Sequence, residues 1–173
     1  FKSLTSLSSL SIKQNDKNKR ATHTTGLVIA IRNTYEIIWH ESRSRTLLCS
    51  IRHKDQMNTI PIYIINVHLE GHPSRSNDRV NQIKSSLQSM RKQQIKTYPT
   101  IKTTDYPMFI VGDFNWTQHS AVHTLLTTGF VPAGLIDNSY NTIVTTTDIE
   151  SEYRFQHAYN NADIPCSFIY LDY

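Results

Sequence analysis

The pattern of apolar and polar positions changes its period along this chain. In the first part, short apolar or β-branched runs separated by polar turns predict consecutive, largely antiparallel strands. These strands are expected at residues 26–32, 35–40, 45–52 and 60–68. A later run at residues 107–112 is short and wholly apolar, which is typical of a strand buried inside a sheet.

Two other stretches have the spacing of amphipathic helices, with apolar residues three or four positions apart. The first follows a Gly-His-Pro breaker and runs to about residue 95. Ser76 or Asn77 is its expected N-cap, and Asp78 favours its first turn. The second covers residues 120–128, and the glycine after it is suited to a helix C-terminus. The apolar positions of the two helices are Val80, Ile83, Leu87, Met90, Val122, Leu125 and Leu126.

The two ends of the chain show less pattern. Residues 1–23, rich in Ser, Lys and Asn, predict a short helix or loop and then a solvated loop. Beyond residue 132 the chain is loop-rich, with order expected at 154–159 and another strand from residue 166. Since there is no internal repeat, we expect a loop segment over residues 1–23 and one mixed α/β domain over residues 24–173.

Composition excludes some classes of function without choosing one. A formal net charge of +4 is compatible with an anionic partner such as nucleic acid or phosphate, but it is not a dense basic arm. Cys49 and Cys166 have no nearby Cys or His partner, which argues against a zinc cluster or a disulfide framework and favours an intracellular, reducing compartment. No apolar run approaches the ~20 residues needed to cross a bilayer.

Polar pairs end two of the apolar strands. The strand period of two places Asn66 and His68 on one face, and it places Asp113 beside Asn115 if that strand continues. Carboxylate and carboxamide oxygens suit Mg²⁺, whereas an imidazole can donate a hydrogen bond to an anionic oxygen. Either pair alone is more often a satisfied strand end or a capped turn. Together they predict hydrolysis of a phosphate ester, in which Asp113 activates water while His68 and Asn66 stabilise the transition state.

These pairs lie in sequence motifs of a known family. Asn-Val-His-Leu at residues 66–69 resembles the Asn-Thr-His-Leu motif of the endonuclease/exonuclease/phosphatase superfamily, and Gly-Asp-Phe-Asn at 112–115 matches its second motif. Residues 78–82 resemble the Arg-x-x-Gln pattern of the helix between them, and 120–130 resemble the helix that follows, whereas Thr25 replaces a family Asp. The resemblance implies an α/β (α+β) fold, a four-layer sandwich of two mostly antiparallel sheets flanked by helices.

The resemblance also implies roles for individual residues. Asp113 matches the aspartate that activates water and holds a Mg²⁺ (or Mn²⁺) ion, and Asn115 matches the asparagine that assists it as a second metal ligand. His68 matches the histidine near the scissile phosphate, with Asn66 beside it. Tyr-Leu-Asp-Tyr at residues 170–173 resembles a strand whose aspartate orients the catalytic histidine, which implies that role for Asp172.

Two residues between the motifs are candidates for contact with substrate. Arg79 belongs to the Arg-x-x-Gln pattern, and Glu70 follows the first motif directly. The alternative for Arg79 is an exposed helix start with Gln82 packed locally. For Glu70 and His72 the alternative is a place in a loop without contact to substrate.

Several substrates suit this family. Phe-Gln-His-Ala-Tyr at residues 155–159 resembles a segment of the deadenylase and nocturnin-like branch, and together with nine Tyr residues it favours an exoribonuclease acting on RNA. A small-molecule or lipid phosphoesterase, and a non-catalytic binding relative, are the alternatives. The family's metal-binding Glu would precede Phe1 and its Ser-Asp-His motif would follow Tyr173, so we expect this fragment to be inactive and its parent protein active.

Overall fold

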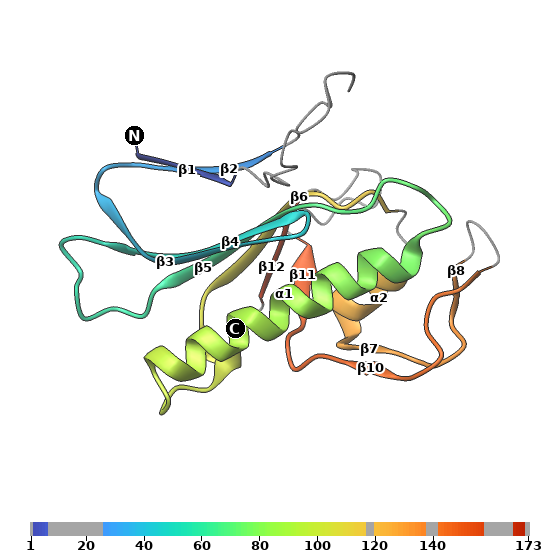
Figure 1. The fold of residues 1–173 in the computed structure, drawn as a ribbon. Coiled ribbons are helices and arrows are strands. Elements are labelled where there is room, and N and C mark those ends of the chain that lie inside the picture. The colour runs from blue at the N-terminus through green and yellow to red at the C-terminus, as the bar shows by residue number, and fades with distance from the viewer. Residues whose placement is uncertain (1, 7–25, 117–119, 138–141, 158–167, 172–173) are drawn as a thin grey trace, which may run out of the picture.

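The computed structural model describes residues 2–6, 26–116, 120–137, 142–157 and 168–171 of this 173-residue chain. Its centre is a six-stranded sheet. The strands are β3 (Tyr35–Arg43), β4 (Thr46–His53), β5 (Ile62–His68), β6 (Met108–Asp113), β11 (Phe155–His157) and β12 (Phe168–Leu171). Their order is β11-β12-β6-β5-β4-β3, and all neighbours are antiparallel except β5 and β6, which are parallel (Figure 1).

Strand β4 shows why these residues lie in the middle of the molecule. Its first six residues, Thr46 through Ile51, are all buried. Leu48 packs into the larger hydrophobic cluster on one face, while Leu47 and Cys49 belong to the smaller cluster on the other. A strand covered on both faces requires such a continuous apolar run. Burial also raises the pKa of the Cys49 thiol to about 12, so this cysteine is a core residue and not a nucleophile.

A two-stranded sheet covers part of one face of the central sheet. It pairs β1 (Lys2–Ser6) with β2 (Leu27–Ile31) in antiparallel register. Ile29 and Ile31 of β2 are buried in the smaller cluster with β4. The prediction of a helix or loop at the start of the chain is therefore wrong for Lys2–Ser6, because pairing with the backbone of β2 outweighs the local spacing of its residues. Residues 7–23 lie outside the described residues.

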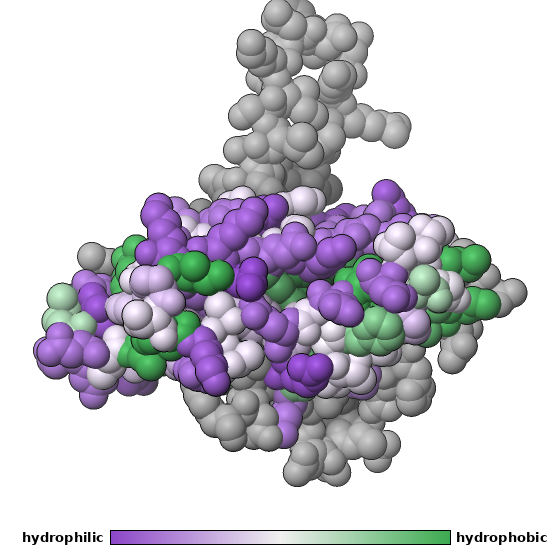
Figure 2. Space-filling view, turned by 90° about the horizontal axis from the view of Figure 1, so that it is seen from below, coloured by the Kyte–Doolittle hydropathy of each residue, from purple (hydrophilic) through white to green (hydrophobic). Residues whose placement is uncertain are grey.

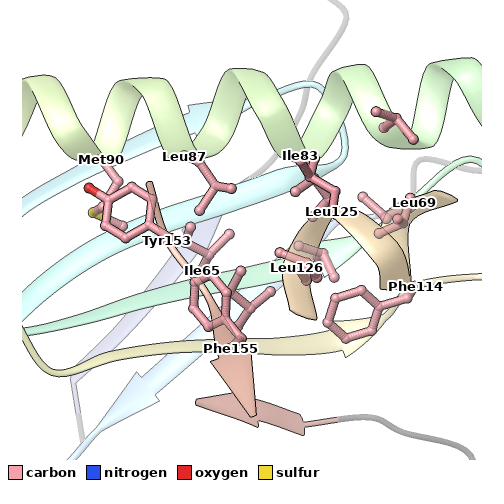
Figure 3. Close-up of a cluster of buried hydrophobic side chains, with 14 of the residues drawn as sticks. Ile65, Leu69, Ile83, Leu87, Met90, Phe114, Leu125, Leu126, Tyr153 and Phe155 are labelled. Carbon is pink, nitrogen blue, oxygen red and sulfur yellow. The ribbon is translucent and has the colours of Figure 1, made fainter. Parts of the chain in front are cut away.

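Two helices, α1 (Ser76–Thr97) and α2 (Ala121–Thr128), cover the opposite face (Figure 1). Their buried side chains meet those of the sheet in the larger cluster (Figure 3). Helix α1 begins after Arg75 without a side-chain cap, so the predicted N-cap is wrong; the hydroxyl of Ser76 instead donates to Asp137. Helix α2 has the predicted C-terminus, since Gly129 adopts the left-handed conformation with φ 75°.

The predicted mixed α/β sandwich is confirmed. The β1–β2 sheet, the central sheet and the helices form successive layers, and within the described part of the chain the helices lie on one side of the sheet (Figure 1). No helix among the described residues is long and apolar enough to span a membrane. Seen from below relative to Figure 1, hydrophilic residues cover much of the surface and hydrophobic ones form separate patches (Figure 2).

Shorter elements complete the described chain. The region after α2, which the sequence predicts to be loop-rich, contains two antiparallel pairs of two-residue strands. They are β7 (Phe130–Val131) with β10 (Ile149–Glu150), and β8 (Ile136–Asp137) with β9 (Thr142–Ile143). The short 3-10 helix η1 (Thr103–Asp105) lies earlier, between α1 and β6.

Candidate active site

The two motifs meet because β5 and β6 are parallel neighbours. In this register Asn66 pairs with Val111 and His68 pairs with Asp113. The carboxyl ends of parallel strands lie at the same edge of a sheet, which is where sites gather in α/β proteins. The sequence predicts both strands and both motifs, and the structure places them side by side.

The strand period divides β5 into a core face and a site face. Val67 and Leu69 are buried in the larger cluster under the helices. Asn66 and His68 point to the opposite face and are only partly buried. The carboxamide nitrogen of Asn66 donates to the carbonyl of Val28 at 3.0 Å, which ties the first motif to β2.

Asp113 and His68 form an open pair at this edge. The Oδ2 atom of Asp113 lies 3.9 Å from Nε2 of His68. The side chains are 63% and 45% exposed, so solvent or a ligand can reach both. The second carboxylate oxygen of Asp113 accepts a hydrogen bond from the backbone N–H of Asn115 at 2.9 Å, which holds the carboxylate in a defined orientation.

Asn115 reaches the site through a turn and not through strand alternation. Strand β6 ends at Asp113, and Asn115 has a left-handed backbone with φ 49°. Its Nδ2 donates to the carbonyl oxygen of Leu69 at 2.9 Å, while the N–H of Leu69 donates to the carbonyl of Asp113. The strand does not continue to Asn115, so the alternation that a continued strand would give does not apply. The turn nevertheless brings Asn115 into hydrogen-bonding contact with Asp113.

Gly112 permits the close approach of the two motifs. Its φ is 119°, and a Cβ atom at this position would lie 2.1 Å from the carbonyl oxygen of Val67. The same Cβ would lie 2.7 Å from Oδ1 of Asn66. Only glycine fits here, because any side chain would collide with the neighbouring strand.

Glu70 lies in the loop after His68 and is held by two ion pairs and one hydrogen bond. Its carboxylate contacts Arg45 at 3.2 Å and Arg75 at 4.0 Å, and accepts from the N–H of His72 at 3.1 Å. The hydrogen bond from His72 and the two guanidinium groups lower the pKa of Glu70 below its ordinary value, against the opposing effect of partial burial. Its side chain is 17% exposed, so its present partners are protein groups.

Arg79 is buried, with 4% of its surface exposed. Its guanidinium donates to the carbonyl oxygens of Glu70, His72 and Pro73 at 2.8–3.1 Å and to the hydroxyl of Ser76 at 2.6 Å. Its Nε is buried without a partner in the described part of the chain. This arrangement is neither the predicted contact with substrate nor the alternative of an exposed helix start. Arg79 holds the loop that follows His68.

Sequence reasoning missed one residue of this edge, Arg45. The pattern placed it at the start of a predicted strand, but it lies in the β3–β4 turn with φ 62°. Its carbonyl accepts from the N–H of His68 at 3.0 Å. The polar Ser-Arg-Ser-Arg run between two apolar strands signals the turn and does not show which residue faces the site. Asp172 lies outside the described residues.

The residues present would supply part of a metal site. Among the described residues, no group of three or more His, Cys, Asp or Glu side chains could hold a metal ion. Mg²⁺, however, commonly takes one or two protein carboxylates and completes its shell with water and phosphate oxygens. The exposed carboxylate of Asp113 suits that arrangement. The amide nitrogen of Asn115 is engaged with Leu69, which leaves its oxygen as the possible second ligand.

Comparison with known proteins identifies similar structures but no similar sequences. No protein-family model matches this chain, and no curated protein matches it significantly. A structure of ANGEL2, a 2′,3′-cyclic phosphatase, in complex with adenosine-2′,3′-vanadate, superposes with a TM-score of 0.55 at 15% identity, covering 90% of this chain and 51% of ANGEL2. A second ANGEL2 structure gives 0.53 at 14% identity, covering 90% and 50%.

The human Nocturnin catalytic domain with bound sulfate gives a TM-score of 0.48 at 12% identity, covering 84% of this chain and 62% of that domain. This chain spans about half the length of the two ANGEL2 structures. At these identities the likeness concerns the fold.

Proposed function

We propose, from the endonuclease/exonuclease/phosphatase fold that this chain has, that the whole protein hydrolyses phosphodiesters of nucleic acid with the help of a divalent cation. The observation that carries the proposal is the open pair of Asp113 and His68 at the carboxyl ends of two parallel strands. Asn66 and Asn115 flank this pair. The edge therefore combines a general base, a hydrogen-bond donor and two amide groups.

Asp113 is the base in this proposal. One of its oxygens accepts from the N–H of Asn115, and the other, on a side chain that is 63% exposed, is left to take a proton from an attacking water. The 3.9 Å between that oxygen and Nε2 of His68 exceeds a hydrogen-bond distance, which leaves the imidazole available for a substrate oxygen. His68 then donates to a phosphoryl oxygen, on which charge increases in the transition state.

A Mg²⁺ or Mn²⁺ ion held by Asp113 and Asn115 would neutralise charge on the phosphoryl oxygens. The charges at this edge support the need for a cation. Arg45 and Arg75 are paired with the carboxylates of Glu70 and Asp78, Arg79 is held by backbone carbonyl oxygens, and Asp113 adds a further negative charge. These six described side chains carry three positive and three negative charges. A divalent cation would offset the negative charge that a phosphate adds beside Asp113.

RNA is the preferred substrate in this proposal, and an exonuclease of deadenylase type is the preferred enzyme. The support is the resemblance of residues 155–159 together with a net charge of +4. A small phosphoester is the second candidate, because ANGEL2 is a 2′,3′-cyclic phosphatase. The third candidate is a non-catalytic protein that binds nucleic acid.

The test is the release of AMP from oligoadenylate by the whole protein with Mg²⁺, beside an Asp113→Ala variant. We expect this variant to lower kcat/KM by about 10³ or more, because the groups of one site act as a unit. Asp55→Ala is the matched control. It removes the same charge from a side chain that is 90% exposed in the loop before β5, at the far end of that strand from His68.

The outcomes separate the three candidates. Release of AMP that requires both Mg²⁺ and Asp113 supports the nuclease. Turnover of an oligonucleotide ending in a 2′,3′-cyclic phosphate, or of a small phosphoester, with no release of AMP would replace the proposed substrate, and loss of that turnover in Asp113→Ala would support the same role for Asp113. Absence of turnover on every substrate would contradict the enzyme and favour the binding protein.

A further inference from the structure

We infer that Arg45, which no sequence motif marks, binds the phosphate next to the hydrolysed one in a single-stranded polynucleotide, and that Glu70 positions Arg45 for this contact. The inference rests on the proposed function, since it places the reacting phosphate at Asp113 and His68. It names an additional contact of the same site. It also gives Glu70 a role other than contact with substrate.

The first support is the position of Arg45 in the sheet. The N–H of His68 donates to the carbonyl of Arg45 at 3.0 Å, and His68 pairs with Asp113 on its other side. Arg45, His68 and Asp113 thus form one row across the ends of three neighbouring strands. Adjacent strands are about 4.8 Å apart, so the backbone of Arg45 lies roughly 10 Å from that of Asp113. An extended substrate that crosses the strand ends from Asp113 would reach Arg45 next.

The second support is backbone conformation. Arg45 and Asn115 are the only residues other than glycine with positive φ in the part of the chain that the structure describes. Both side chains donate to the same acceptor, the carbonyl oxygen of Leu69, Arg45 at 3.5 Å and Asn115 at 2.9 Å. Asparagine adopts this conformation readily, and a two-residue hairpin turn such as the one that contains Arg45 commonly requires it. The two turns therefore bring both side chains to one atom beside the proposed site.

The third support is the state of the guanidinium group. Its side chain is 40% exposed, and its contacts among the described residues are the carbonyl of Leu69 and the carboxylate of Glu70. These contacts leave further N–H donors of the planar guanidinium for a phosphate, which arginine binds with two parallel hydrogen bonds. Glu70 is itself fixed by the N–H of His72. The carboxylate thus restrains a long side chain that would otherwise lose conformational freedom on binding.

The buried Arg79 holds the loop that carries Glu70. It donates to the carbonyl oxygens of Glu70, His72 and Pro73, so the segment that carries Glu70 is held by hydrogen bonds at three residues. The N–H of Glu70 also donates to Gln82 at 3.0 Å. The position of the Glu70 carboxylate, and with it that of Arg45, is thereby set by helix α1.

The experiment is binding of a fluorescent oligoadenylate to the whole protein in EDTA, measured by anisotropy so that turnover plays no part. The variant is Arg45→Gly, because glycine adopts the left-handed conformation freely and should fold at least as stably as the original residue. We expect a roughly tenfold weaker Kd, as for loss of hydrogen bonds to a charged group. The slope of log Kd against log salt should fall by about 0.7, the value for one phosphate contact of a single strand.

Arg43→Gln is the matched control. It removes the same charge from the same hairpin, two residues away, where Arg43 pairs with Glu41. We expect its Kd to stay within about twofold of the original, since a distant surface charge acts weakly. Equal weakening by the two variants would overturn the inference, because the effect would then come from net charge.

A modified substrate locates the contact. Replacing single phosphates of the oligoadenylate by uncharged methylphosphonates should weaken binding of the original protein at the linkage next to the scissile one. The same replacement should have no further effect on Arg45→Gly, as expected for two changes that remove one interaction. If both proteins respond equally at every linkage, or if the original protein binds no oligonucleotide, the inference is wrong.

These measurements also separate the inference from the proposed function. If the protein hydrolyses oligoadenylate and Arg45→Gly binds it with an unchanged Kd, the inference is overturned and the proposed function stands. Binding that depends on Arg45 and on one linkage, without hydrolysis under any condition, would support the contact and contradict the enzyme.

Discussion

The two faces of strands β5 and β6 differ in burial, although the residues that form them alternate along the same backbone. On the helix side, Ile65 and Ile110 are completely buried. On the other side, Phe109 is 41% exposed, while Asp113 and His68 are open to solvent. The helix face is therefore mostly buried, whereas the other face is only partly buried and presents polar groups at its edge.

The separation has a physical reason. A carboxylate on the helix side would lose its hydration in an apolar core, and its charged form would be strongly disfavoured. On the open side Asp113 keeps its hydration and its charge, and hydrogen bonds from a turn orient it. The strand period of two is enough to place the two kinds of residue on opposite faces. Stability and the proposed chemistry should thus respond to different substitutions.

Neighbouring residues of β6 give the sharpest test of this contrast. Ile110→Ala should lower the free energy of unfolding by about 2–5 kcal/mol, because it opens a cavity under the helices. Phe109→Ala, one residue earlier on the exposed face, should cost less than about 1.5 kcal/mol, since part of its side chain is already in solvent. Urea denaturation measures both. Equal losses would show that the two faces are not energetically distinct.

Two arginines near the start of α1 differ in burial in the same way, and the buried one holds the loop that follows His68. Arg79→Met should lower the free energy of unfolding by about 2–4 kcal/mol, because it leaves buried acceptors without their donor. Arg75→Met is the matched control. That side chain is 59% exposed and pairs with Asp78 at the surface, so we expect a change below about 0.5 kcal/mol. A small effect of Arg79→Met would mean that solvent can replace its four hydrogen bonds.

The smallest expected effect concerns Glu70 and pH. Its pKa is lowered below the ordinary value of 4.5 in the folded protein, so its contribution is present above pH 4.5 and is lost as pH falls through the lower folded value. Glu70→Gln should therefore be less stable than the original protein at pH 6, by less than about 1 kcal/mol. The difference should shrink towards pH 3. Thermal denaturation at both pH values measures it, and a difference independent of pH would exclude this electrostatic origin.

Much of the fold could be predicted because its signals are local. The periods of two and of 3.6 residues identified β3, β4, β5, β6 and both helices. The pairing of Lys2–Ser6 with β2 could not be predicted in this way, because the partner lies more than 20 residues away. The N-cap of α1 was missed for a related reason. Ser76 uses its hydroxyl for Asp137, which is 61 residues distant.

The candidate site shows the same division. The polar pairs at residues 66–68 and 113–115 were found because they interrupt apolar strands. The burial of Arg79 and the approach of Arg45 to Leu69 depend on the loop and hairpin packed around them. A lone arginine in a polar stretch of sequence carries no sign of either environment.

By itself, the sequence of this protein determined which residues share a face of each strand or helix, since covalent geometry sets those periods. It also determined the chemical groups at the two strand ends. Only the tertiary structure made β5 and β6 parallel neighbours, with His68 beside Asp113, and brought Arg45 to the same edge. Which strands become neighbours depends on backbone hydrogen bonds and on buried contacts between segments some 20 to 45 residues apart. No local period in the sequence encodes such contacts.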